Sequence, residues 1–290
     1  MLRHFGRECY SKPQDVYETA RRRGMDLVTL TDHDSIAGAL ELAGRPDTFV
    51  SEEVTVLLPG DRQLHVGVLD ITEAQHERIS VLRKDAEALF AYLAEERIPA
   101  VINHLFSALT GDRATEDFGV ALRSGIPLIE GRNGMVNERT NTFARQAGAA
   151  AEIPSIGGSD AHTLASVASA YSIVEGATNR AEFLAGLRRG CVIPAGEHGT
   201  YAKLTRDVVR IFAGGYREAA ATLLDGPGAV FRFGVLVLAL PLMPLIPAVT
   251  GMIYAHEQFF AGYHHRLYRS RVHPVIRQNP WRPASSAVQS

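Results

Sequence analysis

The chain has 290 residues, of which 46% are hydrophobic and 21% charged, as is usual for soluble globular proteins with one large or two smaller domains. Its formal net charge of −2 argues against the basic field that general nucleic-acid binding uses. The two cysteines, Cys9 and Cys191, match no zinc or redox spacing, and residues 1–13 lack the apolar core of a secretory signal. We therefore expect a reduced, cytoplasmic protein.

Short apolar runs alternate with helical patterns through residues 1–198. The first helix is expected to begin near Pro13 and to end at Gly24, because Pro suits a first turn and Gly a helix end. An apolar strand follows at Leu27–Thr31. The other expected strands are Thr48–Ser51, Leu64–Leu69, Ala100–Asn103, Ile126–Ile129, Pro154–Gly157 and Ala170–Val174.

Helical patterns separate several of these strands. Thr72 and Gln75 have the spacing of a capping box at the start of an amphipathic stretch that reaches about residue 97. Residues 136–148 and 180–189 are further helical patterns, whereas residues 54–64 contain "PGDR" and favour a hairpin. Strands that alternate with helices in this way predict an α/β fold with a mainly parallel sheet.

Acidic and histidine residues end five of the expected strands. They are Asp32 with His33, Glu52 with Glu53, His104, Glu130, and Asp160 with His162. Because the parallel strands of a barrel present their carboxyl ends on one face, we expect these side chains to share a pocket. Imidazole and carboxylate ligands suit Zn²⁺, Mn²⁺ or Fe²⁺, and bridging carboxylates suit a site with more than one ion.

The stretches "TDHDSIAG", "SEEVT", "NH" after a strand, and "GSDAH" resemble the motifs of the PHP (polymerase and histidinol phosphatase) family. They occur in the family's order and at similar spacing across roughly residues 10–195. The resemblance implies a distorted seven-stranded (β/α) barrel over residues 1–198. It also implies two or three divalent metal ions (Mn, Zn or Fe) and hydrolysis of a small phosphorylated substrate by a metal-activated water.

The resemblance further assigns roles to single residues. The implied metal ligands are His33, Glu53, His65, His104, Asp160 and His162, with Glu53 as the bridging carboxylate. Asp32 or His162 is the candidate for passing a proton to the leaving group. Arg132, like Arg113, is a candidate for bidentate contact with a substrate phosphate.

Structural roles are open alternatives for some of these residues. The histidines His65 and His104 also suit packing in the core. Asp32 and His33 also suit a strand-end pair, with Asp34 or Ser35 capping the next helix. Glu52 is the alternative to Glu53, and one of the two is expected to face a helix or solvent. No motif supplies a serine or cysteine nucleophile with a histidine base, which disfavours covalent catalysis.

The sequence departs from the PHP pattern at its beginning. PHP proteins open with an Asp-Leu-His-x-His strand that supplies two metal-binding histidines, whereas His4 alone precedes residue 33 here. Either that strand lies upstream or the motif is lost, and its loss would leave the barrel without its first strand and with an open seam. The alternative function is therefore a degenerate, catalytically impaired PHP module that acts as a binding or scaffold protein.

Residues 199–290 carry no PHP motif and are expected to form a helical extension with a flexible tail after Pro274. A helix with basic residues is expected at 201–224. The 21-residue run 234–254 carries no charge, but three prolines interrupt it: Pro241, Pro244 and Pro247. We expect an apolar hairpin within 229–256 that either associates with a membrane or is buried against the barrel or a second subunit.

Overall fold

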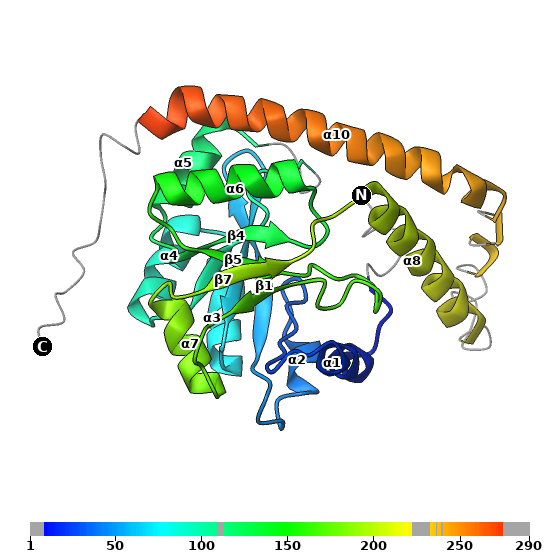
Figure 1. Ribbon diagram of the computed structural model, residues 1–290, viewed down its shortest axis with the longest axis horizontal. Coiled ribbons are helices and arrows are strands. Elements are labelled where there is room, and N and C mark those ends of the chain that lie inside the picture. Colours follow the sequence, from blue (N-terminus) through cyan, green and yellow to red (C-terminus); the bar gives the residue numbers. More distant parts are fainter. Residues whose placement is uncertain (1–8, 109–112, 222–232, 236, 239, 275–290) are drawn as a thin grey trace, which may run out of the picture.

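The computed structural model in Figure 1 describes residues 9–108, 113–221, 233–235, 237–238 and 240–274. A mixed five-stranded sheet lies at its centre, and the strands follow one another in chain order. They are β1 (Ser51–Leu58), β2 (Arg62–Leu69), β3 (Ala100–Ile102), β4 (Leu128–Asn133) and β5 (Ser155–Gly158). A second, antiparallel pair consists of β6 (Ala170–Ile173) and β7 (Ile193–Gly196). The α/β class predicted from the sequence is confirmed.

The hairpin predicted around "PGDR" is confirmed by the pairing of β1 with β2. Its turn places Gly60 and Asp61 at φ values of 78° and 58°, a region that glycine and aspartate tolerate better than most residues. The hairpin makes the sheet less parallel than expected, because β1–β2 and β2–β3 are antiparallel and only β3–β4 and β4–β5 are parallel.

The predicted seven-stranded barrel is not present as a closed sheet in the described residues. The expected strand Leu27–Thr31 and the residues after it form two isolated parallel bridges, Val28 with Thr48 and His33 with Glu53 on β1. The Thr29 hydroxyl donates to the Phe49 carbonyl at 2.6 Å, so a side chain meets a carbonyl that a continuous ladder would pair with a backbone N–H. The sheet therefore stays open at this side.

The helices mostly lie where the sequence predicts them. They are α1 (Pro13–Arg22), α2 (Ala37–Leu40), α3 (Glu73–Leu82), α4 (Ala86–Glu95), α5 (Thr115–Arg123), α6 (Glu138–Ala150), α7 (Arg180–Arg188), α8 (Tyr201–Ala221) and α10 (Ile246–Leu267). The capping box of Thr72 and Gln75 is confirmed. The long helical stretch after it is split, because the Asp85 side chain accepts from the Ala88 N–H at 3.1 Å and starts a second helix.

The C-terminal helices are packed onto the rest of the fold. Figure 1 shows α10 running along α6 at one edge of the molecule, with α8 beside its first half. The π-helical turn η3 (Tyr268–Val272) follows α10 and inserts Tyr268 into the largest core cluster, where its ring lies 5.7 Å from that of Phe106. The extension therefore shares a hydrophobic core with the sheet.

The apolar run 234–254 does not fold back as a hairpin within its described residues. Residues Leu240–Leu245 form a 3₁₀ segment, η2, and α10 begins directly after it. Pro247 lies in the first turn of α10, where a missing N–H leaves no helical hydrogen bond unmade. No helix in the described ranges combines the length and apolar character that crossing a bilayer requires.

Candidate metal centre

Three predicted ligands meet at the hairpin. Glu53 on β1 and His65 on β2 are diagonal neighbours on one face of the pair, because Glu53 pairs with Gly67 and His65 with Thr55. The bridge between His33 and Glu53 adds the third side chain. His33 Nε2 lies 3.3 Å from Glu53 Oε2, His65 Nδ1 lies 3.5 Å from Glu53 Oε1, and the two imidazole centroids are 4.8 Å apart.

His104, directly after β3, joins this cluster from the next strand. Its Nε2 lies 3.0 Å from Glu53 Oε1, and the amide of Asn103 donates to the same oxygen at 2.9 Å. The backbone N–H of His104 donates to Glu130 Oε2 at 2.9 Å. His104 holds a φ of 27°, an uncommon value for a residue with a side chain, and these contacts fix it there.

Asp160 and His162 enter from the loop after β5. The amide of Asn133 donates to both Asp160 Oδ2 and Glu130 Oε2 at 3.0 Å, so β4 orients the carboxylate from the neighbouring strand. His162 Nδ1 lies 3.8 Å from Asp160 Oδ1. Both side chains are partly exposed, whereas Glu53, His65 and His104 are buried.

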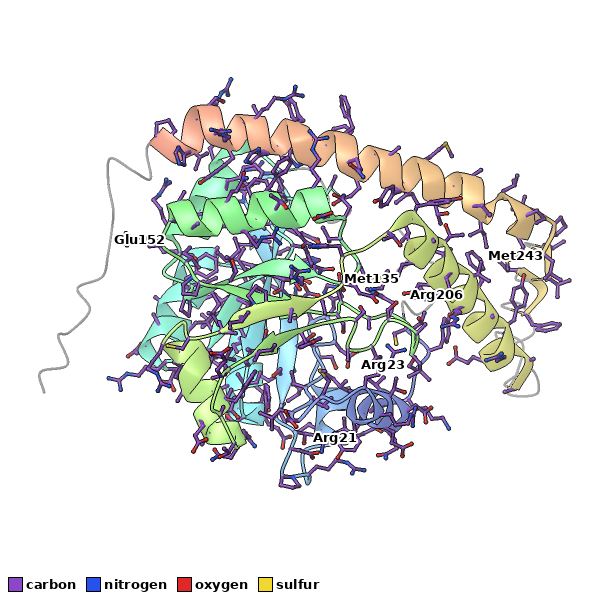
Figure 2. All side chains as sticks on the ribbon, in the orientation of Figure 1. Arg21, Arg23, Met135, Glu152, Arg206 and Met243 are labelled. Carbon is purple, nitrogen blue, oxygen red and sulfur yellow. The ribbon has the colours of Figure 1, made fainter. Side chains whose placement is uncertain are left out.

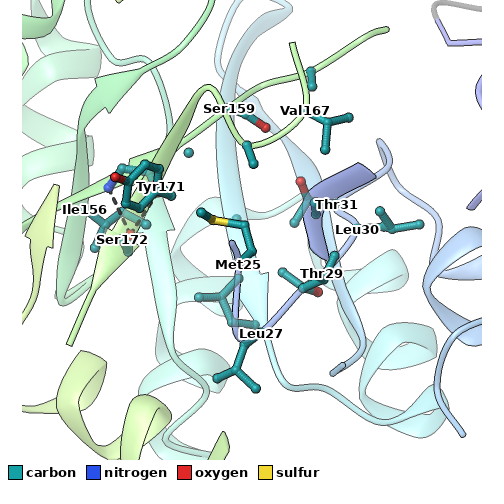
Figure 3. Close-up of a pocket in the computed structure, with 18 of the residues that line it drawn as sticks. Met25, Leu27, Thr29, Leu30, Thr31, Ile156, Ser159, Val167, Tyr171 and Ser172 are labelled. Atoms are coloured by element: carbon teal, nitrogen blue, oxygen red, sulfur yellow. Dashed lines mark hydrogen bonds between the residues drawn. The ribbon is translucent and has the colours of Figure 1, made fainter. Parts of the chain in front are cut away.

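A cavity of about 1360 Å³ opens in front of these groups. The predicted residues that line it are Asp32, His33, Glu53, His104, Asp160 and His162. Figure 3 shows its further walls, one built by residues 25–31 and the other by Ile156, Tyr171 and Ser172. His65 is not among the lining residues, so it approaches Glu53 from behind the wall.

Burial and charge shift the pKa values of the clustered groups in opposite directions. Burial alone would raise the pKa of Glu53, but the hydrogen bonds to His104 and His65 outweigh it and hold that pKa well below its usual range. Burial works to lower the pKa of His104, and the Glu53 carboxylate overrides it and raises the value to about 9. Burial also raises the pKa of Glu130 to about 7.

The pKa values of two further groups, His65 and Asp32, are shifted less strongly. Burial lowers the pKa of His65, against the neighbouring Glu53 carboxylate, and therefore favours the neutral imidazole that can ligate a metal. Asp32 lies exposed at the cavity rim, where partial loss of hydration raises its pKa against the opposing effect of His33 and His162. The two acids Asp32 and Glu53 are thus shifted in opposite directions within one site.

The ring nitrogens indicate that the cluster suits a divalent ion. Three imidazole nitrogens of this cluster have no hydrogen-bond partner within the described part of the chain: Nδ1 of His33, Nε2 of His65 and Nδ1 of His104. Buried polar atoms without a partner are costly, and a metal ion is one partner that imidazole nitrogens accept. One ligand atom each from His33, Glu53 and His65 lies within 4.8 Å of the other two. These residues therefore fit the metal that the resemblance implies.

The structure also separates Glu52 from Glu53. Adjacent residues on a strand point to opposite faces, so Glu52 faces α3 and lies 2.9 Å from Nδ1 of His76. Glu52 is therefore the helix-facing acid, and Glu53 is the one in the cluster. The strand-end geometry we expected is wrong at this point, because Glu52 and Glu53 lie inside β1 and not at its end.

The two arginines considered for substrate binding lie elsewhere. Arg132 donates to the Gly196 carbonyl at 2.7 Å and lies 3.2 Å from His198 Nε2, and it does not line the cavity. Arg113 is buried and donates to the Gln63 carbonyl at 3.0 Å. The geometry therefore gives no support to a phosphate contact from either guanidinium.

Two residues near the site escaped the sequence analysis. Asn103, which holds Glu53, is part of the quoted "NH" motif and could have been named from its position beside His104. Glu257, on α10, accepts from the Ala108 N–H at 2.8 Å and the Ser107 hydroxyl at 3.3 Å, in the loop after His104. No local signal connects Glu257 with a loop about 150 residues earlier in the chain.

One comparison with known proteins matches a segment that contains part of this site. Residues 138–192 match the sequence family described as PHP-associated. The matched segment holds α6, β5, β6, α7 and the Asp160–His162 loop, so it includes one wall of the candidate site.

The other comparisons add little. One solved structure, from Bifidobacterium adolescentis and named a "putative metal-dependent phosphoesterase", is 16% identical with a TM-score of 0.40, and it covers 52% of this chain and 82% of its own. Similarity at that level carries no argument about activity. The search among curated proteins finds no match.

Proposed function

We propose that this chain is a metal-dependent phosphoesterase that acts on a small phosphorylated substrate. The observation that carries the proposal is the meeting of His33, Glu53 and His65 around one point, beside His104 and at the wall of an open cavity. Among the described residues, this is the one group of three or more such side chains close enough to hold an ion. The match of residues 138–192 to the PHP-associated family supports the same proposal.

We assign His33, Glu53, His65 and His104 to a first divalent ion, and Asp160 with His162 to a second, in a di- or trinuclear site of the PHP kind. Bound ions would supply positive charge to a phosphoester and would lower the pKa of an attacking water. The chain supplies the arrangement, since Asn103 orients Glu53 and Asn133 orients Asp160. The buried positions of Glu53, His65 and His104 keep these groups apart from bulk water.

We assign proton transfer to a residue at the exposed rim of the site. Asp32 lines the cavity near His162, and its raised pKa makes it easier to protonate than an ordinary aspartate. A carboxylic acid in that position can give a proton to a leaving alkoxide and recover it from water. We therefore assign Asp32, which lies near His162, to the leaving-group side of the reaction.

The test is hydrolysis of p-nitrophenyl phosphate and of small natural phosphoesters by the full chain, with Mn²⁺ or Zn²⁺ and with a chelator. We expect activity that the chelator removes and that His104→Ala or Asp160→Ala abolishes. The matched control is His256→Ala, an exposed histidine on α10, which should leave turnover unchanged. Unchanged turnover in both His104→Ala and Asp160→Ala would refute the proposal. Metal-free, inactive but folded protein would instead favour the degenerate binding module.

A further inference from the structure

The outer face of α10 and the segment before it form an exposed apolar surface. Ten of the seventeen large hydrophobic side chains that are exposed in the described residues lie between positions 235 and 263. We call this set the apolar face: Val235, Val237, Leu238, Leu240, Leu242, Leu245, Val249, Met252, Phe259 and Tyr263. Figure 2 shows side chains projecting from α10 and from the region of Met243 away from the rest of the molecule. A contiguous apolar surface of this kind marks an interaction site.

The face is a continuous row along the helix. Leu245, Val249, Met252, Phe259 and Tyr263 follow a spacing of four and three residues, with the exposed His256 filling the one gap in the row. Met252 is 66% exposed and Phe259 is 65% exposed, so neither is covered by the fold. The opposite face of α10 is held in place by the buried Glu257, Ala261 and His264. The helix is thus anchored on one side and apolar on the other.

The exposed charges of the described C-terminal extension are of one sign. Within the described part of residues 199–274, the exposed charged side chains are all arginines: Arg206, Arg210, Arg217, Arg266, Arg269 and Arg271. The acids Asp207 and Glu257 are buried, and Glu218 is half-buried. Arg266 continues the apolar row three residues after Tyr263. A surface depression at this end is lined by Tyr263, Arg266, Leu267, Arg269 and Ser270.

From these observations we propose that the apolar face lies on an anionic lipid surface, with α10 parallel to the membrane plane. Apolar and aromatic side chains would enter the headgroup region, and arginines would contact lipid phosphates. A second copy of this chain fits less well, because its own apolar face would bring the same arginines to the contact, and the described part of residues 199–274 holds no exposed carboxylate to pair with them. The proposal is independent of the catalytic proposal, since none of these side chains lines the site cavity.

The test is co-sedimentation of the full chain with vesicles of phosphatidylcholine alone or mixed with phosphatidylglycerol. We expect binding to the anionic vesicles that weakens with added salt. Met252→Glu combined with Phe259→Glu should lower binding at least about 10-fold, because two buried apolar side chains are lost from the contact. The matched control is Val81→Glu, which changes a side chain of similar exposure on α3 and should bind like the unchanged chain.

Three outcomes would overturn the proposal. In the first, the unchanged chain remains in solution with both kinds of vesicle. In the second, the double variant binds vesicles as well as Val81→Glu does. In the third, light scattering shows a dimer that the double variant dissociates, which would assign the face to a second copy. Far-ultraviolet circular dichroism of each variant, compared with that of the unchanged chain, shows whether the fold is retained. Arg266→Glu with Arg269→Glu offers a second route, since it should weaken anionic binding and leave the apolar row intact.

Discussion

The metal-site wall and the outer face of α10 depart from the usual distribution of residues in opposite ways. At the wall, Glu53, His65 and His104 are polar and buried, whereas Met252 and Phe259 on α10 are apolar and exposed. Each arrangement costs free energy in isolation, so each indicates a partner that the protein chain itself does not provide. The buried nitrogens suit a cation, and the arginine-rimmed apolar row suits an anionic lipid surface. The two regions meet at Glu257, which reaches from α10 to the loop after His104.

The largest expected effect comes from removing the acid shared by the cluster. Glu53→Ala takes away the carboxylate that contacts His33, His65 and His104, so we expect loss of bound metal and of phosphoesterase activity. Elemental analysis and turnover measure the two losses. Glu52→Gln is the matched control, since Glu52 is equally buried but contacts His76, and its metal content should stay unchanged. Equal metal loss in both variants would show that the cluster is not the binding site.

The second effect tests the link between the two regions. Glu257→Ala leaves the Ala108 N–H and the Ser107 hydroxyl without their acceptor, and it should lower the free energy of unfolding by about 2–3 kcal/mol. Because that loop follows His104, we also expect about 10-fold weaker metal binding. Denaturant titration and metal titration measure these changes, and Glu257→Gln should recover much of both. A variant that loses stability but keeps full metal affinity would separate the regions.

A third prediction concerns the pH dependence of the metal-free protein. The pKa of His104 is raised from 6.5 to about 9, so its stabilising charge is complete below pH 6.5 and is lost as the pH rises through 9. The pKa of Glu130 is raised from 4.5 to about 7, so ionising it in the folded state costs stability that grows from pH 4.5 to 7. Of these two groups, only His104 still changes the free energy of unfolding between pH 7 and 9.

We therefore expect the melting temperature of chelator-treated protein to fall between pH 7 and 9. His104→Gln should flatten that slope, because glutamine carries no titrating charge. A slope that is the same in the variant would mean that His104 is not held protonated by Glu53.

The smallest effect lies outside both regions. Thr72→Ala removes the side chain that accepts from the Gln75 N–H at the start of α3, which should cost about 1 kcal/mol of folding free energy. Metal content and vesicle binding should not change. A loss of metal in this variant would show that the cluster responds to general destabilisation, and the specific effects above would then need reinterpretation.

Most candidate site residues could be predicted from the sequence, but the strand pairing around them could not. The candidate ligands could be named because acidic and histidine residues follow apolar runs, and alternation along β1 explains why Glu53 and not Glu52 lies in the cluster. The open seam was expected if the first PHP strand is absent. The remaining pairing of the sheet could not be predicted from local patterns, since it depends on long-range contacts that residues 27–33 make only in part. Glu257 was missed because its contact spans about 150 residues. Arg132 does not line the cavity, and a bulge between Glu130 and Arg132 shifts the strand register beside it.

The central claim is that the buried histidines and Glu53 form a metal centre. Elemental analysis of the full chain, purified without chelator and dialysed against metal-free buffer, tests it most directly. The account predicts at least about one tightly held divalent ion per chain, which Glu53→Ala loses and Glu52→Gln keeps. A folded chain with no bound ion, and none taken up from added Mn²⁺ or Zn²⁺, would contradict it.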